Sequence, residues 1–181
     1  MGMIGLLRQT ALGERQAFFV DMLDDSARAL LEIINDVLDV SKIEAGRLEL
    51  ELLPFPLRDT IDLVATQFAT SAHERGLQLY LYVDPLVPAR ATGDALRVRQ
   101  VFNNLVSNAQ KFTEHGEIAI VVTRAPCSAE GRLRIRVEVR DTGIGVPREA
   151  GARLFQSFSQ ADNSMARRFG GTGLGLAIAR E

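Results

Sequence analysis

Three segments in the second half of the sequence carry residue types that can hold a nucleotide. They are Asn104–Lys111, with asparagines at both 104 and 108, Asp141–Gly145, and the glycine-rich Gly170–Leu176. Amide oxygens suit Mg²⁺, lysine provides a point charge for a phosphate, and glycine lets a ligand approach the backbone closely. Because the three segments occur in series, we interpret them as parts of one site for a nucleotide such as ATP.

The first segment belongs to a predicted helix from Asp94 to Phe112, with Asp94 as its amino-terminal cap. At 100° per residue, Asn104, Asn108 and Lys111 fall within about 60° of one another, at the edge of the apolar face. Taken alone, such a polar flank is better explained as a solvated helix surface. The helix therefore indicates a site only in combination with the other two segments.

The second segment follows a predicted strand in which apolar and charged residues alternate. The alternation places Asp141 on the same side as Val137 and Val139. A carboxylate aimed inward is costly unless a donor binds it, and the exocyclic amine of adenine is such a donor. Gly143 and Gly145 would let a ring approach the backbone. Asp-Thr-Gly also suits a plain turn, so this segment alone leaves both interpretations open.

The third segment, Gly170–Gly175, leads into a predicted helix that begins near Leu174. Backbone N–H groups and the positive end of a helix can form a cradle for phosphate. The pattern matches neither the Walker loop, which ends in Gly-Lys-Ser/Thr, nor a dinucleotide fold, because no strand directly precedes it. A lone glycine-rich turn is a weak signal, and its weight comes from the two segments before it.

A long helix predicted over residues 15–45 dominates the first quarter of the chain, after a short helix over residues 2–11 and a break at Gly13. Small and apolar residues recur along it at spacings of three and four, which is typical of a helical bundle. We expect a second copy of the chain to complete the bundle, although an ordinary amphipathic helix remains the alternative. The residues of this seam are Val20, Leu23, Ala27, Leu30, Ile34, Val37 and Ser41.

The remaining elements predict an α+β fold, a two-layer α/β sandwich with helices on one face of a mixed sheet. Glycines end the predicted helices, Gly46 after the first long helix and Gly76 after the second. Pro54 and Pro56 are expected to stop the first strand. The predicted strands cover residues 47–53, 77–83, 90–92, 117–124 and 132–140, and the second long helix covers residues 59–75.

Composition excludes several classes of protein. The chain has 181 residues, 46% of them hydrophobic, and a net charge of −2, which argues against a nucleic-acid binder. A single cysteine, Cys127, rules out an internal disulfide framework. No apolar run approaches the length of a membrane span and no signal peptide is evident, so we expect a cytoplasmic segment without membrane contact.

Together these motifs resemble the kinase core of a sensor histidine kinase, of the kind found in hybrid kinases. Sensor histidine kinases belong to the GHKL-type ATPase superfamily, which also includes gyrase, Hsp90 and MutL. The resemblance extends over essentially the whole chain. The segments that carry it are Asn104–Phe112 (N box), Asp141–Gly145 (first glycine box), Phe155–Phe158 (F box), Gly171–Gly175 (second glycine box) and Asn35–Gly46 (end of the second dimerisation helix).

The resemblance implies ATP and Mg²⁺ as ligands and assigns roles to individual residues. Asn108 and Asn104 would serve Mg²⁺, Lys111 a phosphate and Asp141 the adenine. Arg167 or Arg168, in a lid over residues 146–172, would reach the terminal phosphate. The residues expected to line the nucleotide or anchor the lid are Gly143, Gly145, Phe155, Phe158, Gly171, Thr172, Gly173, Leu174 and Gly175.

The resemblance also predicts two domains: a partial dimerisation and phosphoacceptor hairpin over residues 1–46 and an ATP-binding catalytic domain over residues 47–181. The family carries its phosphoacceptor in a His-Glu-x-x-Thr-Pro segment, and the chain opens at Met1–Gly5, in a sequence resembling the one just after it. His73 and His115 lack that context, and the family continues beyond a point like Glu181. We therefore expect a chain that is truncated at both ends and does not autophosphorylate alone.

The implied partners are a second copy of the chain, bound through the helical hairpin, and a response regulator or receiver domain. The resemblance further implies a parent protein anchored in the bacterial inner membrane. Two rival functions stay open at this point. One is an ATP-driven clamp of the gyrase or Hsp90 kind, which the F box and the heptad helix disfavour. The other is a non-catalytic dimerisation module with a decayed site, which the intact Asn108, Lys111 and Asp141 disfavour.

Overall fold

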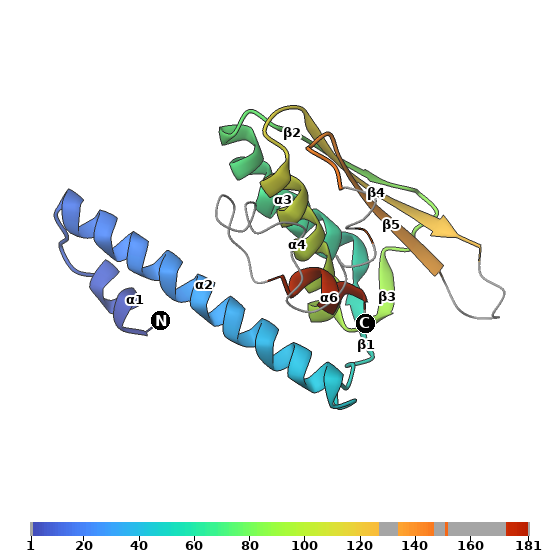
Figure 1. The fold of residues 1–181 in the computed structure, drawn as a ribbon, viewed down its shortest axis with the longest axis horizontal. Coiled ribbons are helices and arrows are strands. Elements are labelled where there is room, and N and C mark those ends of the chain that lie inside the picture. The colour runs from blue at the N-terminus through green and yellow to red at the C-terminus, as the bar shows by residue number, and fades with distance from the viewer. Residues whose placement is uncertain (1, 127–133, 147–150, 152–172, 181) are drawn as a thin grey trace. The chain divides into compact units, whose positions relative to one another are not determined.

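The structure is a computed structural model that describes residues 2–126, 134–146, 151 and 173–180 (Figure 1). The chain divides into two compact units, Met1–Leu48 and Glu49–Glu181. We call them the hairpin unit and, after the role expected from the sequence, the catalytic unit. None of the helices in the described ranges is both long and apolar enough to cross a membrane.

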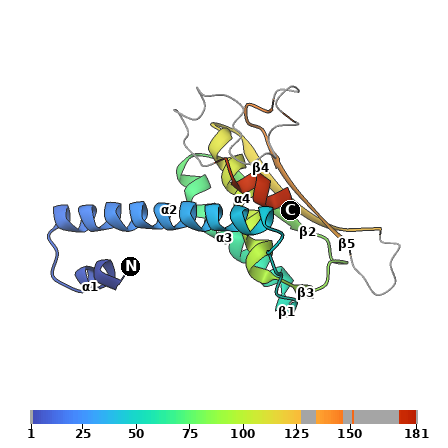
Figure 2. The ribbon, with the colours of Figure 1, turned by 60° about the horizontal axis from the view of Figure 1, so that its bottom comes forward.

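The hairpin unit contains α1 (Gly2–Arg8) and α2 (Glu14–Glu44), which lie side by side in Figure 2. The side-chain Oε1 of Gln16 accepts a hydrogen bond from the backbone N–H of Gly13 at 3.0 Å and so satisfies one of the free donors at the start of α2. After α2, Gly46 adopts a left-handed conformation with φ of 63°. Both predicted helices, the break at Gly13 and the stop at Gly46 are thereby confirmed.

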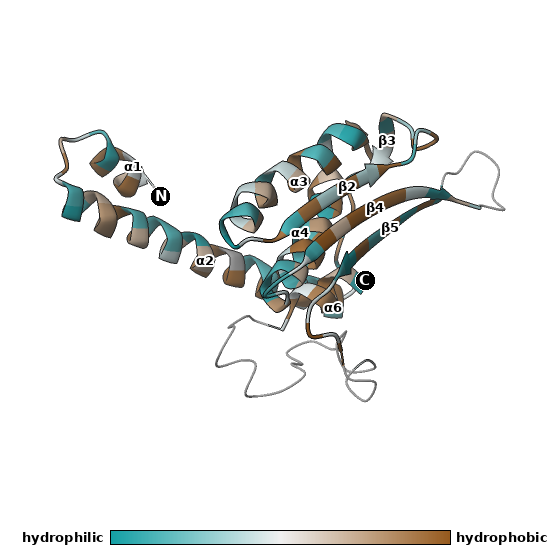
Figure 3. Ribbon diagram, turned by 90° about the horizontal axis from the view of Figure 1, so that it is seen from above, coloured by the Kyte–Doolittle hydropathy of each residue, from teal (hydrophilic) through white to brown (hydrophobic). Residues whose placement is uncertain are grey.

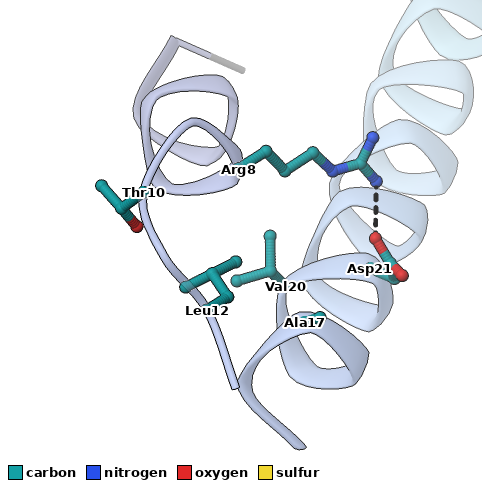
Figure 4. Close-up of a pocket in the computed structure, with 6 residues that line it drawn as sticks. All are labelled: Arg8, Thr10, Leu12, Ala17, Val20 and Asp21. Atoms are coloured by element: carbon teal, nitrogen blue, oxygen red, sulfur yellow. Dashed lines mark hydrogen bonds and ion pairs between the residues drawn. The ribbon is translucent and has the colours of Figure 1, made fainter. Parts of the chain in front are cut away.

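A cluster of charged residues ties α1 to α2. Asp24, whose exposed fraction is only 5%, faces Arg8 at 3.3 Å and Arg28 at 3.0 Å. Arg8 also donates to Asp21 Oδ1 at 2.9 Å, and this pair lines a cavity of about 420 Å³ together with Leu12 and other residues of the turn (Figure 4). A buried carboxylate that lost these partners would be strongly destabilising, so the cluster holds the hairpin closed.

Apolar side chains remain exposed along most of α2. This apolar stripe includes members of the predicted seam, such as Leu30, which is 58% exposed, and Ile34, which is 45% exposed. A monomeric protein rarely exposes so continuous an apolar surface. The exposed residues of the stripe are Phe18, Phe19, Met22, Leu23, Leu30, Leu31, Ile33, Ile34, Val37 and Leu38.

The catalytic unit opens with a two-stranded antiparallel sheet of β1 (Leu53–Pro56) and β3 (Arg90–Gly93). The prediction of a strand over residues 47–53 that stops at the prolines was wrong, because the strand contains Pro54 and Pro56. Two prolines at alternate positions fall on the same side of a strand, and a two-stranded sheet needs backbone hydrogen bonds on one side only. Phe55, between them, is buried.

The main sheet has three strands in the order β2-β4-β5: β2 (Gln78–Val83), β4 (Glu117–Ala125) and β5 (Arg134–Asp141). β4 pairs parallel with β2, with Leu81 opposite Ile120, and antiparallel with β5. A parallel pair requires a long crossover, which contains α4 (Ala95–Phe112). The predicted hairpin over residues 117–140 and the strand at 90–92 are confirmed.

Helix α3 (Leu57–Glu74) and α4 cover one face of this sheet (Figure 1). Between the two layers lies a core whose central members have no exposed surface, and Figure 3 shows the hydrophobic colouring along β4. The other face carries polar and aromatic residues, including Tyr80, which is exposed, and Arg136, which pairs with Glu138 at 2.6 Å. The predicted two-layer α+β sandwich is confirmed. The members of this core with no exposed surface are Ile61, Val64, Val106, Ile120 and Val122.

Candidate functional site

The amino-terminal end of α4 is fixed by Asp94, as the sequence predicts. Its Oδ1 accepts from the N–H of Arg97 at 3.0 Å, and its Oδ2 accepts from the N–H of Glu51 at 3.3 Å. These backbone bonds, that of Arg97 foremost, lower the pKa of Asp94 below its ordinary value of 3.8. The cap thus anchors the helix that carries the first predicted segment.

Asn104, Asn108 and Lys111 lie half-buried along α4, beside the fully packed face that holds Val106 and Ala109. Burial lowers the pKa of Lys111, whose Nζ lies 5.0 Å from the centroid of the Phe112 ring. A partly dehydrated ammonium interacts more strongly with an anion than a fully solvated one does, because the local dielectric is lower. This end of α4 is therefore suited to attract a phosphate group.

The carboxyl end of α4 is capped from α3 by residues that the sequence analysis missed. The guanidinium of Arg75 donates to the carbonyl oxygens of Gln110 at 2.6 Å and of Thr113 at 3.4 Å. The buried Gln110 donates in turn to Ser71 Oγ at 2.8 Å. A cation at a helix carboxyl end satisfies free carbonyls and favours the dipole. Sequence periodicity carries no signal for the bond to Gln110, because it joins two residues that are 35 positions apart in the sequence.

The first glycine box packs against the same end of α4. The N–H of Ile144 donates to the Phe112 carbonyl at 3.3 Å, and a Cβ added to Gly143 would lie 2.3 Å from that oxygen. Only glycine fits at such a distance. Thr142 Oγ1 accepts from the N–H of Glu117 at 3.0 Å, which joins the box to the start of β4. The box is therefore held by α4 on one side and by the sheet on the other.

The structure corrects the prediction that the carboxylate of Asp141 is desolvated. Asp141 lies opposite the buried Ile118 in the β4–β5 register and hence on the inner side of the sheet, as the alternation predicts. Its side chain is nevertheless exposed, because β5 ends there, and its Oδ1 accepts from the N–H of Gly143 at 2.9 Å. The predicted desolvation cost of an inward carboxylate does not apply, while the alternative of a turn cap describes this bond.

The second glycine box reaches α4 through α6 (Gly175–Arg180). Asn104 Nδ2 donates to the Gly175 carbonyl at 2.9 Å, while Leu174 is only 1% exposed and Gly173 has a φ of 70°. The amide-bearing helix therefore contacts both the residues after β5 and the residues at the start of α6. The described residues of the second and third predicted segments thus both contact α4, which carries the first.

Other predicted site residues lie outside the described residues: Phe155, Phe158, Arg167, Gly171 and Thr172. Among the residues that the structure does describe, no group of three or more His, Cys, Asp and Glu side chains gathers to hold a metal ion. The cavity of the hairpin unit is lined by none of the predicted nucleotide residues. Mg²⁺ does not require such a group, because it usually binds through few protein atoms together with phosphates and water.

Comparison with known protein families decides what this arrangement is. Residues 93–181 match the model of the histidine kinase-, DNA gyrase B- and HSP90-like ATPases, and residues 1–46 match the phosphoacceptor domain of histidine kinases. The chain belongs to the histidine kinase family. It contains the core of a two-component sensor kinase, and the matched ATPase range includes every predicted nucleotide-site residue.

Similar proteins cover this kinase core from end to end. It is 50% identical over 99% of its length to the signal transduction histidine-protein kinase BarA of Escherichia coli and 46% identical to the sensor protein GacS of Pseudomonas syringae. The chain spans 20% of the length of each relative. A crystal structure of full-length ShkA in complex with AMPPNP matches 98% of the chain and 35% of its own, with a TM-score of 0.73 and 36% identity.

Proposed function

We propose that this chain binds Mg²⁺-ATP and, in a complete kinase, delivers the γ-phosphoryl group to a histidine for relay to a response-regulator aspartate. The observation that carries the proposal is the contact of both glycine boxes with the helix that bears Asn108 and Lys111. Two comparisons support the proposal. The chain is similar in sequence to a histidine kinase over 99% of its length, and it is similar in structure to ShkA, which was solved in complex with AMPPNP.

The predicted residues of the N box and of the two glycine boxes have the following roles in this proposal. Asn108 offers an amide oxygen to Mg²⁺, and the resemblance implies the same role for Asn104. Lys111 binds a phosphate, and Asp141 accepts from the adenine amine. Gly143, Gly145 and the residues from Gly171 to Gly175 line the nucleotide. When bound, the metal neutralises charge that develops on the transferred phosphoryl group, and the protein contributes position and electrostatic stabilisation.

We also propose that residues 1–46 form the dimerisation part and residues 47–181 the catalytic part. The match of the phosphoacceptor model to residues 1–46 supports this division, as does the exposed apolar stripe of α2, which suits a bundle with a second copy. Both histidines, His73 and His115, lie in the catalytic unit, so the sequence offers no acceptor on α1 or α2. A response regulator as partner and membrane anchoring of a parent chain stay predictions.

Isothermal titration calorimetry with a non-hydrolysable ATP analogue and Mg²⁺ tests the nucleotide site. We expect the wild-type chain to bind and Asp141→Asn to lose at least about tenfold in affinity, because the amide cannot reproduce a charge-assisted acceptor. Asp62→Asn, on the exposed surface of α3, is the matched control and should bind like wild type. Equal affinities of wild type and Asp141→Asn would contradict the assignment of Asp141.

A second measurement distinguishes the proposed kinase from the two rival functions, the ATP-driven clamp and the non-catalytic dimerisation module. Incubation of the chain alone with radiolabelled ATP should leave no acid-labile label, whereas label on the isolated chain would refute the prediction. A folded chain that binds no nucleotide in calorimetry would favour the non-catalytic dimerisation module. Binding with steady ATP hydrolysis and opening or closing of a dimer would favour the clamp.

A further inference from the structure

The contact between Asn104 and Gly175 gives the first asparagine of the N box a specific chemical task. A backbone carbonyl only accepts hydrogen bonds, so the amide must turn its Nδ2 toward Gly175 O, which it reaches at 2.9 Å. The bond links residues 71 positions apart in the sequence. It joins the middle of α4 to the first residue of α6.

The packing around Gly175 shows that the whole amide group lies against it. A Cβ added to Gly175 would stand 3.0 Å from Cγ, 3.1 Å from Oδ1 and 3.3 Å from Nδ2 of Asn104. These three atoms are the nearest neighbours of that position. Gly175 is not among the glycines with positive φ, so its backbone does not require glycine. A Cβ there would instead be tight against Asn104, whose amide would have to shift by a few tenths of an ångström.

Asn108 differs from Asn104 in this respect. It lies one turn further along α4, on the same flank, and is not among the nearest neighbours of a Cβ at Gly175. The oxygen of Asn104 already lies close to Gly175, so a metal ion could approach it only where α6 leaves room. The two asparagines of the box are therefore not equivalent.

We propose that Asn104 is a positioning residue that seats the start of α6 on α4, and that Asn108 alone supplies the protein amide oxygen to the metal. This inference rests on the proposed nucleotide function. It reassigns a residue to which the family resemblance gives a metal role. The pair of Asn104 and Gly175 then works as one unit, since the hydrogen bond and the close packing join the same two residues.

A double-mutant cycle without any nucleotide tests the packing part on the full chain. We expect Gly175→Ala to lower the melting temperature by roughly 2–4 °C. In the Asn104→Ala background the same change should cost much less, because the clashing amide is gone and alanine favours a helix. Equal costs of Gly175→Ala in both backgrounds would overturn the proposal.

Nucleotide titrations, with Mg²⁺ and with EDTA, test the division of roles. Asn104→Ala and Asn104→Asp should both weaken binding of the ATP analogue by about tenfold whether or not Mg²⁺ is present, since either change removes one donor bond. Asn108→Ala should weaken binding only when Mg²⁺ is present. A metal-dependent loss in Asn104→Ala that Asn104→Asp restores, because its carboxylate keeps oxygen ligands, would identify Asn104 as a metal ligand and overturn the proposal.

The two measurements distinguish failure of this inference from failure of the proposed function. If wild type bound no nucleotide, the proposed function would fail, while the melting cycle would still decide whether Asn104 and Gly175 are coupled. If wild type bound nucleotide and the cycle were additive, only the inference would fail.

Discussion

The catalytic unit buries its apolar residues in a core, whereas the hairpin unit leaves many of its apolar residues exposed. In the catalytic unit Ile61, Val106 and Ile120 lose all contact with water between two layers. In the hairpin unit, α2 is 31 residues long, yet Leu30, Ile34 and Leu38 each keep close to half or more of their surface exposed. One unit holds a core of its own, and the other presents the apolar half of a core.

This difference separates what each unit requires for stability. Two packed layers around one core are sufficient for a domain to fold alone. A helical pair with an exposed stripe gains its stabilisation from a partner, which here is a second hairpin in the proposed bundle. Substitutions should therefore affect folding of the catalytic unit and assembly of the hairpin unit independently, and the following experiments test this separation.

The largest effect is expected from the centre of the catalytic unit. Ile120→Ala leaves a cavity between α3, α4 and the sheet and should cost about 2–5 kcal/mol in free energy of unfolding. Hydrogen exchange read by mass spectrometry should show lost protection in β2 and β4 with unchanged protection in α2. Loss of protection in both units would show that they unfold together.

Assembly should respond to the apolar stripe. Leu30→Asp places a charge in the proposed dimer interface and should weaken association by about a hundredfold, because an unpaired charge is costly to bury. Sedimentation velocity measures this, and calorimetry should show unchanged nucleotide affinity. The control is Leu86→Asp, at a leucine of the catalytic unit that is 68% exposed. Dimers that persist in Leu30→Asp would contradict the proposed interface.

A smaller effect is expected at the capped end of α4. Arg75→Met removes the bonds to the Gln110 and Thr113 carbonyls and should destabilise the catalytic unit by about 1 kcal/mol, since Arg75 is itself exposed. Chemical denaturation followed by circular dichroism measures the change. Arg134→Met, at an exposed position of β5, should leave stability unchanged. An equal loss in both variants would assign the effect to charge alone.

The smallest effect is expected at Asp94, and it depends on pH. Asp94→Ala should cost about 1 kcal/mol at pH 7 through loss of the cap. Because the pKa of Asp94 is lowered in the folded chain, its contribution is complete above the unfolded value and is lost as the pH falls through the folded one. Denaturation from pH 7 to pH 3 should show the stability difference shrinking below about pH 4. A constant difference would show that the carboxylate charge is irrelevant.

Hydrophobic periodicity and the positions of glycines were enough to predict most of the fold. The heptad spacing of apolar residues predicted α2, and the alternation of apolar and polar residues predicted β4 and β5. Gly46 and Gly76, which both have a positive φ, follow the ends of α2 and α3 as predicted. The first strand was misplaced because proline was taken as a stop signal. In a two-stranded sheet the missing donors face away, a condition that depends on a partner strand found only in the fold.

The candidate site was predictable only as far as its chemistry is local. The amides and glycines were recognisable by type and spacing, but their mutual contacts were not. Arg75 and Gln110 meet through the packing of α3 on α4, and the exposure of Asp141 follows from where β5 ends. Such features depend on three-dimensional neighbours that are distant in the sequence.

The parallel pairing of β2 with β4 has a consequence for how the chain acquires its structure. The two strands meet in register, Gln78 with Glu117, only after the intervening 38 residues have folded back, whereas α1 and α2 are neighbours along the chain. Contacts of high sequence separation slow folding, so the hairpin should form well before the sheet. During synthesis the hairpin also emerges first from the ribosome. Two nascent chains would thus acquire the means to recognise each other before either one can hold its ligand.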